Sequence, residues 1–91
     1  MKRYHIIVEG RVQGVGFRYF CVTLAKERGL TGSVKNLLNG MVEIYVQGES
    51  EKIDSFLSAI QKGNFLIRVD NMSLKRSEVI EDEKDFTYLI Y

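Results

Sequence analysis

The residues best suited to chemistry lie in one glycine-rich segment, from Gly10 to Arg18. It joins a strand-like stretch to a helix-like stretch, and its glycines at 10, 14 and 16 permit positive φ angles. Such a loop can turn consecutive N–H groups toward one point, and the helix N-terminus adds further unpaired donors. Arg18 would stand near the positive end of the helix dipole, where a bound anion would relieve the unfavourable charge. The segment therefore predicts a phosphate or carboxylate site.

These glycines do not fit the two common nucleotide-binding motifs. No Gly-Lys-Ser/Thr follows them, as a P-loop requires, and the Gly-x-Gly-x-x-Gly spacing of dinucleotide-binding folds is absent. The pattern therefore disfavours both a nucleotide triphosphatase and a Rossmann enzyme.

Two stretches of the chain resemble the signatures of the acylphosphatase family. The first signature reads aliphatic-x-Gly-x-Val-Gln-Gly-Val-x-Phe-Arg, and every defined position is filled between Val8 and Arg18. The second reads Gly-aromatic-Val-basic-Asn, then three residues and Gly-x-Val, and it matches residues 32–42 with Asn36 as the asparagine. One position departs, because Ser33 stands where an aromatic residue is usual. The resemblance covers essentially the whole chain.

The resemblance implies an enzyme that hydrolyses the carboxyl–phosphate anhydride of small acyl phosphates, giving a carboxylate and inorganic phosphate without a metal. It implies that Asn36 orients the attacking water. It also implies that the phosphoryl oxygens are bound by the Arg18 side chain and the loop N–H groups, from the residues Gln13, Gly14, Val15, Gly16, Phe17 and Arg18. The leaving carboxylate has a conjugate acid with a pKa of roughly 4, so it departs without an acid catalyst. We expect no cofactor.

Two other functions are compatible with such a scaffold. The first is a module that binds phosphate or carboxylate without turnover, although a pure binder would not need Asn36. The second is an RNA-binding or structural domain, since similar sheets bind RNA. The stacking signature for RNA is missing, and the net charge of +1 gives no basic surface.

Length and composition set the broad class of the protein. We expect residues 1–91 to form a single acylphosphatase-like domain, with 45% hydrophobic and 27% charged residues as in folded proteins. Cys21 and His5 are each the only residue of their type, which excludes an intrachain disulfide and the usual zinc-ligand sets. The chain has no apolar run of about 20 residues and no signal-peptide pattern at its start. We therefore expect a cytoplasmic protein that binds neither nucleic acid nor membrane. We also expect a monomer, and the family resemblance implies that it binds a small acyl phosphate.

Periodicity predicts the secondary structure. Strands are expected over residues 3–10, 31–38, 41–47, 66–78 and 86–91, and helices from Phe17 to a stop at Gly29 and from an N-cap at Ser50 to a stop at Gly63. Asn39-Gly40 predicts a type I′ hairpin turn. This order predicts an α+β, ferredoxin-like fold (split βαβ, βαββαβ plus a short C-terminal strand), an antiparallel sheet with two helices on one face.

Two side-chain expectations accompany this fold. Phe17, Tyr19 and Phe20 are expected in the core rather than on a substrate platform. The acidic run over residues 81–85 lacks the spacing of a calcium loop, so it is expected to be a solvated connection.

Overall fold

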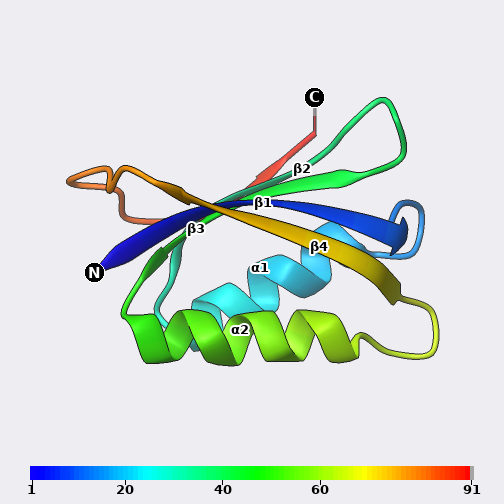
Figure 1. Cartoon of the computed structure of the whole chain (residues 1–91), viewed down its shortest axis with the longest axis horizontal. Coiled ribbons are helices and arrows are strands. Elements are labelled where there is room, and N and C mark those ends of the chain that lie inside the picture. The colour runs from blue at the N-terminus through cyan, green and yellow to red at the C-terminus, as the bar shows by residue number, and fades with distance from the viewer. Residues whose placement is uncertain (91) are drawn as a thin grey trace.

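The computed structural model describes residues 1–90, which form one five-stranded sheet and two helices. Figure 1 shows both helices packed against the same face of the sheet. The elements in chain order are β1 Lys2–Arg11, α1 Phe17–Glu27, β2 Thr31–Asn36, β3 Val42–Gly48, α2 Ser50–Lys62, β4 Arg68–Ser77 and β5 Phe86–Leu89. The predicted fold class is confirmed, and the last predicted strand residue, Tyr91, lies outside the described residues.

The strand order in the sheet is β4-β1-β3-β2-β5. Neighbours among the first four of these strands are antiparallel, as predicted, whereas β5 pairs with β2 in parallel. The predicted antiparallel arrangement therefore holds for four strands, and the β2–β5 pair at this edge departs from it. The cause is the connection after β4, which crosses to the opposite edge at the end of the sheet where β2 also begins (Figure 1).

The core lies between the sheet and the two helices. Alternate residues of β1 and β3 are buried, as period two predicts, and the helices contribute residues spaced at one turn. The fully buried side chains include Ile6, Val8, Phe17, Cys21, Val42, Ile44, Ile53, Phe56 and Ile60. Tyr19 is 71% exposed, so its expected place in the core is wrong. Its position is about 200° around the helix from Phe17, which points it away from the sheet.

The hairpin between β2 and β3 differs from the predicted type I′ turn. Leu37 N–H donates to Met41 O (2.9 Å) and Gly40 N–H donates to Leu37 O (3.2 Å), so the turn spans Leu37 to Gly40. Only Gly40 has the positive φ angle (91°), whereas a type I′ turn also requires it at Asn39. Asn39 instead accepts a hydrogen bond from Met41 N–H through its Oδ1 (3.0 Å). This side-chain bond lies within the longer turn, and β2 ends at Asn36 because the turn begins at Leu37.

The helix ends agree largely with expectation. Gly29 follows the last turn of α1 with a φ of 67°, and Gly63 ends α2. The N-cap of α2 is Glu49, however, and Ser50 is its first helical residue. No side chain caps this helix start with a hydrogen bond. The serine predicted as the N-cap therefore lies one position too late in the chain to cap the helix.

The connection between β4 and β5 is not simply solvated. Glu83 is half-buried and its Oε1 accepts from Arg3 Nη1 (2.8 Å) and from Thr31 Oγ1 (2.7 Å). Gln47 binds the same connection by donating to Ile80 O and accepting from Ile80 N–H, each at 2.8 Å. The acidic run therefore carries one structural anchor among its solvated charges.

Candidate active site

The loop between β1 and α1 has the backbone conformation that the sequence predicts. Gly14 and Gly16 adopt φ angles of 73° and 78°, and Gly16 is the N-cap of α1 in the left-handed region. A Cβ at either position would meet no atom within 4 Å, so the glycines are required by conformation and not by space. Gly10 has a different structural role, because it lies inside β1 at a bulge against β4.

The turn of this loop leaves a row of backbone donors without acceptors. In the part of the chain that the structure describes, the N–H groups of Gln13 to Arg18 donate no hydrogen bond to a protein group. The last of these groups belong to the first turn of α1, where the helix dipole is positive. No acidic side chain lies in that turn to compensate the charge. The loop is thus arranged as an anion-binding concavity.

Arg18 projects from the start of α1 toward the C-terminal strand. Its Nη1 donates to Leu89 O (2.8 Å), and its Cζ lies 4.5 Å from the centroid of the Tyr88 ring. Both partners belong to β5, whose Leu89 is paired with Lys35 of β2. Asn36 is the next residue of β2, so Arg18 and Asn36 lie at the same end of the same two strands.

Asn36 carries the one buried side-chain polar atom that has no partner among the described residues. Its Oδ1 accepts no hydrogen bond although the atom is closed off from solvent. Such a buried acceptor costs about 1–3 kcal/mol if nothing satisfies it. Asn36 also lines a hollow at the end of β2, formed by residues 35–39.

Gln13 connects the glycine loop to the β2–β3 turn. Its Nε2 donates to Leu37 O and to Met41 O, each at 2.8 Å, so it holds the loop beside the turn that follows Asn36. The sequence assigned only the N–H group of Gln13 to the site and missed this side-chain contact. The two acceptors are 24 and 28 residues away in the chain, and no local pattern points to them.

Tyr88 and Leu89 are further neighbours of the site that the sequence did not indicate. Phe17, by contrast, is buried in the core, so that only its backbone can face a ligand. Ser33, the residue that departs from the family signature, is half-buried opposite Tyr45 of β3. Alternation along β2 puts Ser33 on the other face of the sheet from Asn36. An aromatic residue at this position would therefore pack on Tyr45 rather than reach the glycine loop.

Cys21 and His5, the only cysteine and the only histidine, lie outside the glycine loop. Burial raises the pKa of the Cys21 thiol far above its ordinary value, so this thiol is inert in the folded protein. His5 Nε2 lies 2.8 Å from Glu43 Oε2, on the sheet face away from the helices. Among residues 1–90, no group of three His, Cys, Asp or Glu side chains is arranged to hold a metal ion. No helix in that range is long and apolar enough to cross a membrane.

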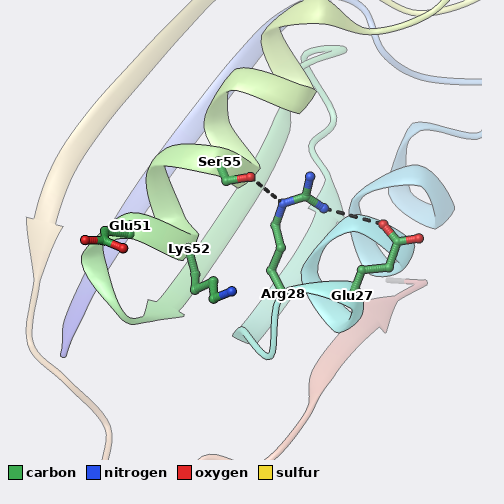
Figure 2. Close-up of a pocket in the computed structure, with 5 residues that line it drawn as sticks. All are labelled: Glu27, Arg28, Glu51, Lys52 and Ser55. Atoms are coloured by element: carbon green, nitrogen blue, oxygen red, sulfur yellow. Dashed lines mark hydrogen bonds and ion pairs between the residues drawn. The ribbon is translucent and has the colours of Figure 1, made fainter.

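A second hollow lies between the end of α1 and the beginning of α2 (Figure 2). Arg28 extends across it, donating from Nε to Ser55 Oγ (2.9 Å) and from Nη1 to Leu24 O (3.0 Å) and Glu27 Oε1 (3.4 Å). Glu27, Arg28, Glu51 and Lys52 line it with charges of both signs, and in Figure 2 Lys52 extends toward Arg28 while Glu51 points away from it. These contacts join the two helices and leave no excess charge for an anionic ligand.

Comparison with known proteins identifies the class to which this fold and loop belong. Residues 4–88 match the family model described as acylphosphatase. An acylphosphatase of Clostridium beijerinckii is 51% identical over 96% of this chain and 97% of its own length. One of Geobacillus thermodenitrificans is 49% identical over 94% of this chain and 92% of its own length. The crystal structure of an acylphosphatase from Bacillus subtilis matches with a TM-score of 0.93 at 41% identity, covering 99% of this chain and 100% of that one.

The chain therefore belongs to the acylphosphatase family. Its activity is hydrolysis of acyl phosphates, which confirms the function predicted from the two signatures. The roles of individual residues stay predictions.

Proposed function

We propose that Arg18 and the N–H groups of Gln13 to Arg18 bind the phosphoryl group, and that Asn36 orients the water that attacks it. The observation that carries this proposal is the row of loop donors without protein acceptors, beside an arginine and an unpartnered asparagine oxygen. The guanidinium can bind two phosphoryl oxygens with parallel hydrogen bonds, which a lysine cannot do. As the phosphoryl group is transferred, charge spreads over its equatorial oxygens, and these fixed donors stabilise it.

The chemistry needs no acid or base side chain. The water oxygen forms a bond to phosphorus while the bond from phosphorus to the acyl oxygen breaks, and its electron pair leaves with the carboxylate. The proton of the water passes to a phosphoryl oxygen. The Asn36 side-chain amide holds the water and directs a lone pair of the water oxygen toward phosphorus, a role that an amide fills without changing its protonation state.

The same reasoning sets the substrate class. A carboxylate whose conjugate acid has a pKa of roughly 4 leaves unaided, whereas an alkoxide needs a proton donor. The proposed set of Arg18, Asn36 and the loop N–H groups contains no such donor. The enzyme should therefore act on acetyl or benzoyl phosphate and turn over alkyl phosphates poorly.

The test is hydrolysis of benzoyl phosphate in the presence of a chelator, with an alkyl phosphate as the negative substrate. Arg18→Ala should lower kcat/KM about 1000-fold, since one preorganised donor contributes about 10²–10³ in rate and Arg18 supplies more than one. The Arg18→Ala substitution should also raise the inhibition constant of inorganic phosphate. Asn36→Ala should lower kcat about 100-fold and leave phosphate inhibition unchanged, because Asn36 is assigned to the water.

Arg11→Ala is the matched control, since Arg11 is exposed at the end of β1 and its removal changes the net charge equally. Undiminished turnover by Arg18→Ala would refute the assignment. An equal loss in Arg11→Ala would show that only the overall charge matters.

We also propose that the enzyme works as a monomer in the cytoplasm. The support for a monomer is that large exposed apolar side chains are spread over separate turns, as at Leu38, Phe65 and Ile80. The edge strand β4 also carries charged residues such as Arg68 and Lys75, which discourage pairing between sheet edges. The support for the cytoplasm is the lone cysteine. Light scattering on a size-exclusion column would test the monomer, and fractionation of the source cells the compartment.

A further inference from the structure

We infer that Tyr88 is a positioning residue that, together with the Leu89 carbonyl, holds the Arg18 guanidinium in the orientation in which it receives the phosphoryl group. This inference rests on the proposed function of Arg18. It adds a residue of the C-terminal strand, outside both signature stretches, to the parts on which hydrolysis depends.

The first step is the pair of contacts that fix the guanidinium. The hydrogen bond from Nη1 to Leu89 O sets its position along β5, and the Tyr88 ring 4.5 Å from Cζ covers one side of it. A planar cation held on an aromatic ring presents its edge, and the edge is where its N–H groups lie. Among the described residues, this is the only hydrogen bond that Arg18 donates, so most of its five N–H groups remain for a ligand.

The second step is the local charge. Arg18 lies in the first turn of α1, where the helix dipole disfavours a cation. Without a partner, the long side chain would be more stable extended into solvent, because it would lie farther from the helix dipole and have more conformational entropy. The carbonyl oxygen and the electron-rich ring face of β5 offset this repulsion, so the strand keeps the side chain in place before substrate arrives.

The third step is the register of the sheet. Tyr88 is paired with Val34 and Leu89 with Lys35, immediately before Asn36. The strand that holds Arg18 is therefore hydrogen-bonded to the strand that ends in Asn36. Because β5 fixes the arginine relative to the asparagine, loss of the Tyr88 ring should misalign the two groups that act on one phosphorus atom.

The experiment compares Tyr88→Phe, which keeps the ring, with Tyr88→Leu, which keeps an apolar side chain but removes the ring. Inhibition by inorganic phosphate and hydrolysis of benzoyl phosphate are measured for both. Tyr88→Phe should stay within about twofold of the unaltered protein, whereas Tyr88→Leu should raise the inhibition constant of phosphate and KM about 10-fold, within the range expected for a cation–π contact. A purely structural role would lower kcat through the folded fraction and leave the inhibition constant unchanged.

Thr87→Ala is the matched control in the same strand, since Thr87 is exposed and lies one position away on the opposite sheet face. Urea unfolding of each variant shows whether folding is intact. In the Arg18→Ala background, Tyr88→Leu should have no further effect on either constant.

The outcomes separate the two proposals. If Arg18→Ala retains hydrolysis, the proposed function is wrong. If Arg18→Ala is inactive but Tyr88→Leu inhibits and turns over like Tyr88→Phe, the positioning role alone is overturned. An additive effect of Tyr88→Leu in the Arg18→Ala background would overturn it as well.

Discussion

Two arginine–amide pairs lie at opposite ends of the sheet, and they differ in how completely their hydrogen bonds are satisfied. At one end, Arg3 and Gln47 are 5% and 3% exposed, and Arg3 binds both Gln47 Oε1 (3.2 Å) and Glu83 Oε1 (2.8 Å). At the other end, Arg18 donates one hydrogen bond within the described chain, and the oxygen of Asn36 accepts none.

This difference separates a structural use of the same residue types from a functional one. The Arg3 cluster, formed by Arg3, Gln47, Glu83 and Thr31, uses its polar atoms to fasten the β4–β5 connection to the sheet. The polar groups near the glycine loop are fixed by Gln13 and β5 but keep donors and an acceptor without protein partners. Because buried polar groups are almost always paired, the incomplete set is the one that we propose to bind the ligand.

The largest contrast is expected between Asn36→Ala and Gln47→Ala. Asn36→Ala should lower kcat about 100-fold and leave the free energy of unfolding unchanged or about 1 kcal/mol higher, because it removes a buried acceptor without a partner. Gln47→Ala should lower the free energy of unfolding by about 3 kcal/mol, since it removes three hydrogen bonds. Its kcat per folded molecule should be unchanged. Urea titration and benzoyl phosphate hydrolysis, measured on both variants, decide this contrast, and a destabilised Asn36→Ala would contradict it.

Arg3→Ala should have the next largest effect. It leaves the Glu83 carboxylate, with a side chain only 19% exposed, without its charged partner. Breaking a largely buried pair in this way costs about 3 kcal/mol. For a domain of this size the midpoint of thermal unfolding should fall by about 12–24 °C. Calorimetry measures this shift, and activity at a temperature where the variant is folded should match the unaltered protein. A parallel loss of kcat would mean that the two ends of the sheet are coupled.

Gln13→Ala should affect both stability and activity, each moderately. It removes one of the two donors that Leu37 O and Met41 O each have, which lowers the free energy of unfolding by about 1–2 kcal/mol. The glycine loop also loses its link to the turn after Asn36, so KM for benzoyl phosphate should rise. Gln61→Ala is the matched control, because Gln61 is exposed and makes only a 3.4 Å contact with Val69 O. Unchanged KM in Gln13→Ala would show that the loop keeps its shape by itself.

The sequence predicted this division of roles only in part. Features set by local spacing were correct, such as the positive φ angles of Gly14 and Gly16 and the glycine ends of both helices. The order of elements was sufficient to identify the ferredoxin-like fold. Both are consequences of contacts between near neighbours, which periodicity and turn residues encode.

The contacts that distinguish the two ends of the sheet could not be predicted in this way. Arg3 reaches Glu83 across 80 residues and Arg18 reaches Leu89 across 71. Both depend on the β4–β5 connection returning the chain to the edge beside β2, a path that leaves no periodic signal. The prediction for Tyr19 was wrong although the signal is local. It relied on the aromatic residue type, whereas the position of Tyr19 on the helix points the side chain into solvent.

The smallest expected effect tests where the boundary between the two regions lies. Ser33 stands between Tyr45 and Thr87 in neighbouring strands, on the face of β2 away from Asn36. Ser33→Tyr should restore an aromatic pair across the strands and raise the free energy of unfolding by about 0.5 kcal/mol, with Ser33→Ala as the control for loss of the hydroxyl. Because the new ring faces away from the glycine loop, kcat and KM should stay within about twofold. If KM for benzoyl phosphate falls while KM for acetyl phosphate does not, the ring contacts the acyl group. The substrate site would then extend around the end of β2 onto the other face of the sheet.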